Sequence, residues 1–201
     1  MARLLLASRG IPGLAALAGA VGRRALLVPD AADPLGEPGI PDEVERELSE
    51  AGFDVARLSL AGSSAERVRS AVQASDVLAV SGGDPFHLLA VARRAAFGTA
   101  ARAALHAGTV YIGYSAGAMV AGPTLEPALM TSPFTPSPDL ELDLTGLGLV
   151  DVLVLPHDGR PGRHERNLAA QAAFAGRVRS VALRDGDVLV VADGTESLLR
   201  R

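Results

Sequence analysis

The chain of 201 residues is 48% hydrophobic and 21% charged, a composition that predicts a globular protein and excludes a disordered chain. Its formal net charge of −4 at pH 7 argues against nucleic acid or an anionic membrane surface as the main partner. It contains no cysteine, which excludes disulfides, thiolate metal sites and a cysteine nucleophile.

The first apolar run, over residues 3–7, is short. A basic start followed by leucines is the form of a signal peptide, but Arg9, Gly10 and Pro12 interrupt the run at once. Every apolar run falls short of the roughly 18 residues that span a bilayer. We therefore expect a buried strand over residues 3–7, in a cytoplasmic protein that makes no membrane contact.

Apolar runs then alternate with helical patterns through the first half of the chain. The runs predict strands over residues 3–7, 25–28, 53–60, 77–80 and 109–112. The helical patterns lie over residues 14–21, 43–51, 63–73, from 85 onward, and 100–106. We expect Asp42 and Thr99 to cap two of these helices, and residues 30–41, rich in proline, to form a loop. This alternation predicts an α/β fold with a mostly parallel sheet and helices on both faces.

Residues 121–149 interrupt this alternation. They hold five prolines, which oppose a long helix, so we expect an irregular loop that borders a pocket. The remaining patterns predict a strand over residues 150–155, a helix over 163–174 and strands over 180–183 and 188–191. The dipeptide Asp185-Gly186 favours a tight turn, which would join the last two strands into a C-terminal hairpin. Without a linker or repeat, residues 1–201 are expected to form a single domain.

The segment Gly113–Gly117 has the sequence form Gly-x-Ser-x-Gly and directly follows a predicted strand. This is the form of a nucleophile elbow, in which a serine occupies a sharp turn between a strand and a helix. The backbone N–H groups that follow would lie at a helix N-terminus, where they can stabilise negative charge. An ordinary turn whose Ser115 merely caps the helix has the same sequence form. The pentapeptide by itself leaves both interpretations open.

A serine nucleophile needs a base, and histidine is the usual one. His87 and His106 lie inside predicted helices, and His164 lies among charged residues at a helix start. His157 directly follows a hydrophobic strand, at the edge of the sheet where Ser115 is expected. His157 is therefore the candidate base, with an ordinary loop histidine as the alternative.

The carboxylate that would orient this base is not fixed by position alone. Asp158, Asp185, Asp187 and Glu196 all follow the candidate base in the chain. For Asp185 a purely structural role is the strong alternative, because Asp-Gly dipeptides form hairpin turns without any catalytic purpose.

Four ordered segments resemble the peptidase E family, which contains α-aspartyl dipeptidases and cyanophycinases. Residues 111–118 resemble its nucleophile segment, and residues 81–84 are similar to its Gly-Gly-Asn element. Residues 154–157 are similar to its strand-Pro-His segment, with the helix start at Arg163 beyond it. Residues 182–186 are similar to the segment that holds its acidic triad member. The resemblance spans nearly the whole chain.

The resemblance implies a three-layer fold of the class I glutamine amidotransferase or flavodoxin type, and a cytoplasmic serine peptidase. It assigns Ser115 as the nucleophile and His157 as the general base, with Asp185 in the place of the family's orienting Glu. Backbone N–H groups of Gly83 and Ala116 would form the oxyanion hole. The family implies short peptides as substrates and neither a metal nor an organic cofactor. We further expect a homodimer or a higher homo-oligomer, as for small enzymes of this fold.

Several positions depart from the family pattern. Asp185 is one methylene shorter than the usual Glu, and Met119 and Met130 replace polar residues near the nucleophile. Asp84 stands where Asn is usual, so it would either contact a substrate amino group or cap the next helix. Arg163 would either receive a substrate carboxylate or lie exposed at its helix start. These departures predict an exopeptidase, a dipeptidase or aminopeptidase, that is not restricted to N-terminal Asp.

Two alternatives remain at this stage. An α/β-hydrolase esterase shares Gly-x-Ser-x-Gly, but its triad follows the order Ser, acid, His. The candidates here follow the order Ser115, His157, Asp185, which speaks against an esterase. The departures from the family pattern also allow a catalytically silent binding or regulatory domain on the same fold.

Overall fold

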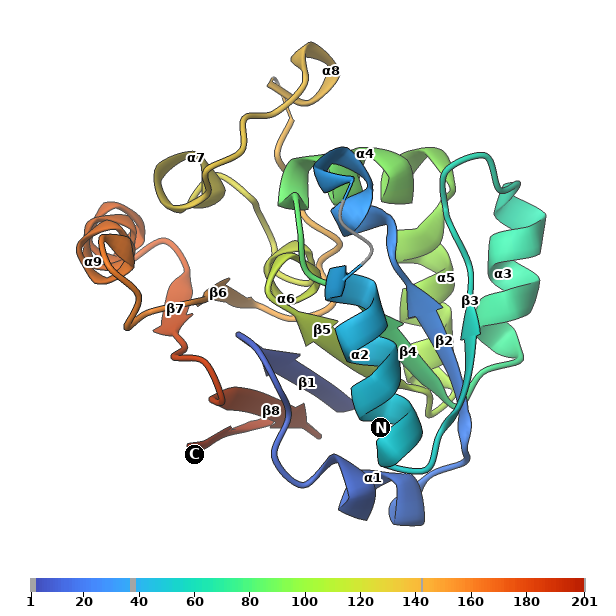
Figure 1. The fold of residues 1–201 in the computed structure, drawn as a ribbon. Helices are drawn as coiled ribbons and strands as arrows, with labels where there is room; N and C mark the ends of the chain where they lie inside the picture. The colour runs from blue at the N-terminus through green and yellow to red at the C-terminus, as the bar shows by residue number, and fades with distance from the viewer. Residues whose placement is uncertain (1–2, 37–38, 142, 201) are drawn as a thin grey trace.

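The computed structural model describes residues 3–36, 39–141 and 143–200, and in this part of the chain the main sheet has seven strands. These strands are β1 (Arg3–Ala7), β2 (Arg24–Val28), β3 (Asp54–Arg57), β4 (Val77–Val80), β5 (Val110–Tyr114), β8 (Val188–Ala192) and β9 (Thr195–Leu199). Their order across the sheet is β3-β2-β4-β5-β1-β8-β9. The five strands from β3 to β1 are parallel, and β8 and β9 are antiparallel additions at one edge (Figure 1).

Helices cover both faces of this sheet (Figure 1). They are α1 (Leu14–Ala20), η1 (Asp30–Leu35), α2 (Gly39–Glu50), α3 (Ala65–Gln73), α4 (Pro85–Arg94), α5 (Phe97–His106), α6 (Ala116–Val120), α7 (Ala128–Thr131), α8 (Pro138–Glu141) and α9 (Arg163–Phe174). Two apolar cores separate the layers: one holds side chains of α1 and α2, and the other holds side chains of α3, α4, α5 and α6. The predicted three-layer α/β architecture is therefore confirmed. Within the described residues no helix is long and apolar enough to cross a membrane.

The alternation of side chains along a strand explains why one apolar run serves both cores. In β4, Val77 and Ala79 belong to the core under α1 and α2, whereas Leu78 and Val80 belong to the other core. All four are buried. Central strands of a parallel sheet are covered on both faces, so they appear in the sequence as continuous apolar runs. This is why β4 and β5 were predictable from composition.

A second, two-stranded sheet lies beside the main one and is formed by β6 (Val152–Leu155) and β7 (Arg179–Ala182) (Figure 1). The two strands are parallel, with Leu155 opposite Ala182, and α9 is the crossover between them. The prediction that residues 180–183 pair with 188–191 is therefore wrong. A parallel pair needs a long connection, which α9 supplies, whereas a two-residue turn can only join antiparallel strands.

The C-terminal hairpin is formed instead by β8 and β9. Its turn contains Asp193 and Gly194, both with positive φ (54° and 77°). Positive φ at both central residues is the requirement of a type I′ hairpin turn, which Asp-Gly satisfies well. The sequence thus carries a further Asp-Gly turn signal after Asp185-Gly186, and the sequence analysis did not predict the strand at Thr195–Leu199 that follows it.

Helix boundaries differ from the predictions at two caps. Helix α2 already begins at Gly39, so Asp42 lies in its first turn and pairs with Arg57. Helix α5 begins at Phe97, so Thr99 lies inside it. The predicted loop at 121–149 is largely irregular as expected, and its described residues, 121–141 and 143–149, include the four-residue helices α7 and α8. Residues 37–38, within the predicted loop at 30–41, lie outside the described residues.

Candidate active site

The turn from β5 into α6 places Ser115 in a strained conformation, with φ 48° and ψ −104°. Such a conformation costs of the order of 1–3 kcal/mol and persists only where surrounding contacts enforce it. Both glycines of the motif are required by close packing. A Cβ atom on Gly113 would lie 2.6 Å from the Gly117 carbonyl oxygen, and one on Gly117 would lie 2.3 Å from the Val80 oxygen. Of the two interpretations of this segment, the geometry is that of a nucleophile elbow.

The three predicted triad residues are in hydrogen-bond contact. Ser115 Oγ lies 2.8 Å from His157 Nε2, and His157 Nδ1 lies 2.8 Å from Asp185 Oδ1. His157 follows β6 and Asp185 follows β7, so the parallel pairing of these two strands brings base and acid to the same edge. These contacts fit a tautomer in which Nδ1 carries the proton and Nε2 accepts from the Ser115 hydroxyl.

Ser8 is a further member of this network that the sequence analysis missed. Its hydroxyl donates to Asp185 Oδ1 (2.7 Å), accepts from the His157 backbone N–H (2.8 Å) and lies 3.1 Å from His157 Nδ1. The bond to the backbone holds His157 in its left-handed conformation, φ 63°. Ser8 directly follows β1, the neighbour of β5 in the sheet. Its position at the carboxyl edge, near Ser115, could therefore have been predicted from the sequence.

Arg160 holds the second oxygen of the triad carboxylate. Its Nε and Nη2 atoms both bond to Asp185 Oδ2, at 2.8 and 2.7 Å. Burial by itself raises the pKa of Asp185, but the hydrogen bonds from Ser8, His157 and Arg160 outweigh it and lower the pKa to about 2. The carboxylate is therefore ionised at neutral pH, although it is one methylene shorter than Glu.

The electrostatic surroundings keep His157 neutral. Burial lowers the pKa of His157 below its ordinary value, and the hydrogen bond and charge of Asp185 oppose this shift. The positive charges of Arg160 and Arg163 lower the pKa of His157 further. A base must be unprotonated before it can accept a proton, so an imidazole with a pKa below 6.5 suits this role at pH 7.

Gly83 and Ala116, the two residues predicted to form the oxyanion hole, lie close to the nucleophile. Gly83 lines the cavity together with Ser115, and Ala116 is the first residue of α6, whose early N–H groups have no acceptor within the helix. Gly83 has φ 141°, and a Cβ atom there would lie 2.0 Å from the Ala31 carbonyl oxygen, so only glycine fits. Both candidates for the oxyanion hole thus belong to the same strand-end region as the nucleophile.

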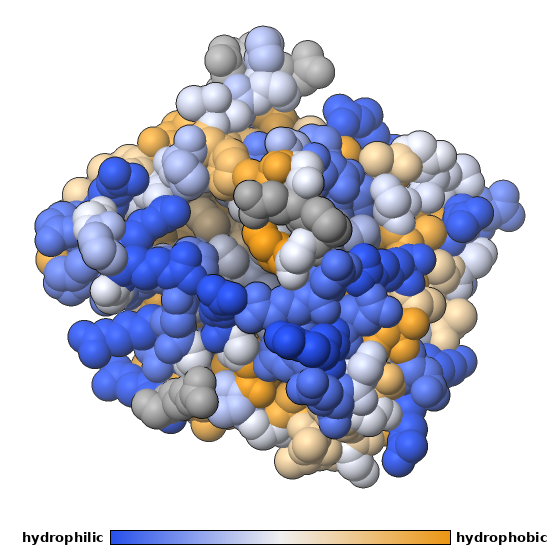
Figure 2. Space-filling view, viewed as in Figure 1, coloured by the Kyte–Doolittle hydropathy of each residue, from blue (hydrophilic) through white to orange (hydrophobic). Residues whose placement is uncertain are grey.

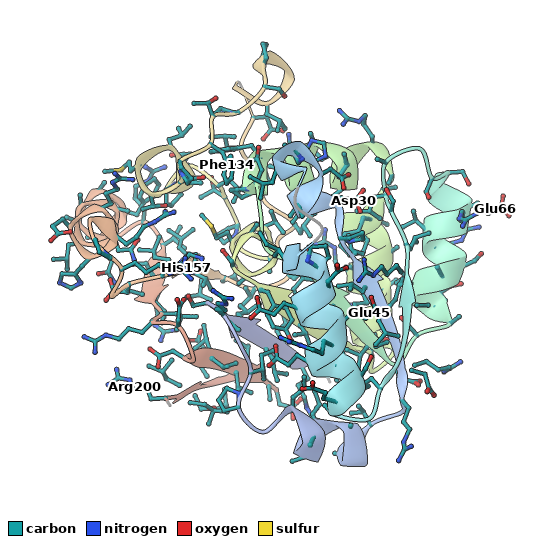
Figure 3. All side chains as sticks on the ribbon, in the orientation of Figure 1. Asp30, Glu45, Glu66, Phe134, His157 and Arg200 are labelled. Atoms are coloured by element: carbon teal, nitrogen blue, oxygen red, sulfur yellow. The ribbon has the colours of Figure 1, made fainter. Side chains whose placement is uncertain are left out.

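A cavity of about 260 Å³ opens over Ser115 and His157. Figure 2 shows the hollow on the face viewed there, with apolar residues inside it and hydrophilic residues along its left and lower rim. Its apolar lining comes from opposite sides of the sheet edge: Leu35, Ile40, Val44, Met119, Pro133 and Phe134. Ser132, Pro133 and Phe134 belong to the irregular segment 121–149, so this segment borders the pocket as predicted (Figure 3). Met119 lines the cavity, whereas Met130 is 41% exposed.

The two predicted substrate-binding residues differ in their placement. Arg163 lines the cavity, donates from Nη1 to the Thr131 carbonyl oxygen, and has its pKa lowered by burial. Asp84 is buried at the start of α4, where Oδ1 accepts from the N–H groups of Phe86 (2.8 Å) and His87 (3.2 Å). Of the two roles that the sequence leaves open for Asp84, these contacts are those of the helix cap.

The other candidate acids, and His164 and His106 among the other histidines, are engaged elsewhere. Asp158 lies 3.1 Å from His164 Nδ1 and accepts from Asn167, Glu196 pairs with Arg179, and Asp187 accepts from the Arg184 N–H. His106 Nδ1 lies 2.7 Å from the Arg102 carbonyl oxygen. Among the described residues no cluster of three or more histidine or carboxylate side chains suited to a metal ion occurs.

Comparison with known proteins gives a family. The family model described as Peptidase family S51 matches residues 9–199. An uncharacterized peptidase of Pasteurella multocida is 30% identical over 116 residues, which are 58% of this chain and 56% of the relative. An uncharacterized peptidase of Listeria innocua is 31% identical over 114 residues, 56% of this chain and 54% of the relative. The matched region is thus about half the length of these curated relatives.

Two crystal structures share the fold across the whole chain. One, from Listeria monocytogenes EGD-e, is provisionally described as a peptidase E protein, with a TM-score of 0.82 and 20% identity over 100% of this chain and 99% of that one. The other is a peptidase from an acI-B1 actinobacterium, with a TM-score of 0.70 and 20% identity over 100% and 94% of the two chains. Together with the family match, these results confirm the resemblance that the four ordered segments predict.

Proposed function

Because the chain belongs to peptidase family S51, we propose that it is a serine exopeptidase that releases the N-terminal residue from short peptides. The observation that carries this proposal is the continuous set of contacts from Ser115 through His157 to Asp185 beside a cavity. A nucleophile, a base and an orienting carboxylate in this arrangement are the requirements of acyl transfer. The lining of this cavity is largely apolar and gives no reason for strict selection of Asp, so we propose an activity that is not restricted to peptides with N-terminal Asp.

In the first half of the proposed reaction, Ser115 Oγ attacks the carbonyl carbon of the first peptide bond as His157 Nε2 takes the hydroxyl proton. The negative charge that develops on the carbonyl oxygen is stabilised by the N–H groups of Gly83 and Ala116. The protonated His157 then gives its proton to the leaving amine, and the C–N bond breaks. Asp185 remains ionised throughout and balances the charge of the imidazolium.

In the second half, water attacks the acyl-enzyme while His157 takes its proton. The ester bond to Ser115 Oγ then breaks, the serine recovers its proton, and the free N-terminal residue leaves. Arg163 is our candidate for a substrate carboxylate, because a guanidinium has five N–H donors and, among the residues that the structure describes, Arg163 uses one of them, in the bond to the Thr131 carbonyl oxygen. The cavity of about 260 Å³ suits short peptides rather than folded proteins.

A panel of dipeptides, aminoacyl p-nitroanilides and short-chain esters, assayed with the wild type and Ser115→Ala, tests this proposal. We expect Ser115-dependent cleavage of unblocked peptides and little turnover of the esters. Turnover confined to esters would point to the esterase alternative, and no Ser115-dependent turnover would point to a silent domain. Analytical ultracentrifugation would test the homodimer that we propose with it.

A further inference from the structure

The cavity over the nucleophile contains a carboxylate without a cationic partner. Arg9, at the rim, is held by Glu43 through bonds of 2.8 to 3.2 Å, and Arg160 is held by Asp185. Glu47 also lines this cavity, but in the described part of the chain it takes part in no ion pair. Two of the arginines that line the cavity, Arg9 and Arg160, are therefore already paired with other carboxylates.

The surroundings of Glu47 make this lack of a counter-charge costly. Glu47 lies on α2 and is partly buried, and its Oε1 accepts one hydrogen bond, from the Ile11 N–H at 2.6 Å. Burial raises the pKa of Glu47, against the lowering effect of Ile11 and Tyr114. A buried charge is stabilised only when it is paired or well hydrogen-bonded. A cation bound in the cavity would supply the missing charge.

A second polar group beside Glu47 also lacks a partner. The Tyr114 hydroxyl is fully buried, lies next to the Glu47 carboxylate, and makes no hydrogen bond of ordinary geometry to any described residue. Burial, together with the charge of Glu47, raises the pKa of Tyr114, so the phenol stays neutral and keeps its acceptor lone pairs. Tyr114 lines the same cavity and directly precedes the nucleophile Ser115.

We propose that Glu47 is the subsite for the positively charged α-amino group of the substrate, with the Tyr114 hydroxyl as a second acceptor. An ammonium group has three N–H donors and needs such acceptors when it leaves water. Helix α2, marked by Glu45 in Figure 3, and His157 lie on opposite sides of the site. The N-terminus of the peptide then points toward α2, and its leaving part points toward α9 and Arg163. This subsite rests on the proposed exopeptidase function and explains why cleavage would be limited to the first residue.

Matched substrates with and without the amine test the subsite. Alanyl p-nitroanilide and its N-acetyl form are assayed with the wild type and Glu47→Gln, because glutamine keeps the bond to the Ile11 N–H and removes only the charge. For the free amine we expect KM to rise about 10- to 100-fold, the range for a lost hydrogen bond to a charged group, with kcat changed less. For the acetylated substrate we expect no change. An unchanged KM for the free amine would overturn the assignment.

Glu50→Gln is the matched control, because Glu50 is on the same helix but exposed. It should leave the preference for the free amine as in the wild type. An equal loss of preference in Glu50→Gln would show that the general field of α2, rather than contact with Glu47, attracts the amine, and would overturn the assignment. Thermal unfolding of both variants identifies any loss of folded protein.

A binding measurement keeps the subsite testable without turnover. In the Ser115→Ala background, calorimetric titration with alanyl-alanine and N-acetyl-alanyl-alanine compares the two peptides directly. We expect the Glu47→Gln change to raise the Kd of the free peptide about 10- to 100-fold and to leave that of the acetylated peptide unchanged. If both peptides bind alike, the subsite is wrong even where the peptidase activity is present. If the subsite holds while no peptide is cleaved, only the proposed reaction is wrong.

A basic side chain carries the same kind of charge as an α-amine. Nα-acetyl-lysyl p-nitroanilide separates these two sources, because it has the side-chain ammonium alone. We expect it to be as poor a substrate as the acetylated alanyl compound in the wild type. If Glu47→Gln abolished an efficient cleavage of this compound, Glu47 would be a side-chain pocket, and the assignment to the α-amine would be overturned.

Discussion

The nucleophile and its two partners are held by two parts of the molecule that are built differently. Ser115 follows β5, a strand whose five residues are all buried, and its N–H bonds to the Ala7 carbonyl oxygen of the neighbouring strand at 2.9 Å. His157 and Asp185 follow the strands of the small sheet, and every residue of β7 is at least partly exposed. Among the described residues no strand pairing joins the two sheets.

Side chains, together with the backbone hydrogen bond from the Gly186 N–H to the Arg9 carbonyl oxygen (2.8 Å), connect the two halves of the catalytic site. Ser8 follows a strand of the main sheet but bonds to His157 and Asp185, which follow strands of the small sheet. The contact between Ser115 and His157 crosses the same junction. A strand ladder fixes backbone positions through many bonds, whereas this junction depends on a few, so single substitutions there should affect catalysis strongly and folding weakly.

Removal of the nucleophile gives the largest expected effect. Ser115→Ala should lower kcat/KM for peptide cleavage by about 10⁴-fold or more, because no other group of the site forms the acyl intermediate. The main sheet holds this position through its backbone, so the midpoint of thermal unfolding should stay close to that of the wild type. Residual activity within tenfold of the wild type would contradict the assignment of Ser115.

Loss of the triad carboxylate comes next. Asp185→Asn should lower kcat by roughly 10³- to 10⁴-fold, because the amide can hold His157 in the wrong tautomer and no longer balances the imidazolium. Asp158→Asn is the control, since Asp158 contacts His164 and Asn167 instead. Steady-state kinetics of both variants decide the matter, and a larger loss for Asp158→Asn would overturn the triad.

Ser8→Ala tests the junction itself. We expect kcat to fall about 10- to 100-fold with little change in KM, because the His157 backbone N–H loses its acceptor, at a cost of about 1–3 kcal/mol, and Asp185 Oδ1 loses one of its two donors. Ser8→Thr keeps the hydroxyl and should recover much of kcat. If the threonine variant is as slow as the alanine variant although both are folded, the hydroxyl of Ser8 is not what positions His157.

The pH dependence should show the smallest effect. Because burial lowers the pKa of His157, kcat/KM should be lost on acidification only as pH falls through a pKa below 6.5. The positive charge of Arg160 contributes to this lowering, so Arg160→Gln should move the acid limb toward higher pH. Arg94→Gln, an exposed position on α4, should leave the profile unchanged. A limb that moves toward lower pH in Arg160→Gln would contradict this account of the site.

Much of the fold was predictable because its signals are local. The buried strands β1, β4 and β5 and the crowded glycines of the elbow each depend on a few neighbouring residues. Two errors at the C-terminus, the wrong pairing of residues 180–183 and the missed strand β9, arose because the deciding contacts are not local. The dipeptide Asp-Gly occurs three times in the chain, and the pairs at 185–186 and 193–194 both lie where a turn could close the C-terminal hairpin. Only the second closes a hairpin, because the strand before the first pairs with distant β6 instead.

The sequence by itself determined the layered α/β architecture, the elbow at Ser115 and the candidate base His157, because periodicity, glycine and strand ends express these features locally. The tertiary structure decided which of four acids meets His157, and it brought Ser8, 149 positions away, into the same network. It also decided that Glu47 lies in the cavity without a counter-charge, whereas Glu43, one helical turn earlier, is paired with Arg9. These outcomes depend on contacts between segments that are distant in the sequence. The free energies of such contacts cannot be inferred from the spacing of residues along the chain.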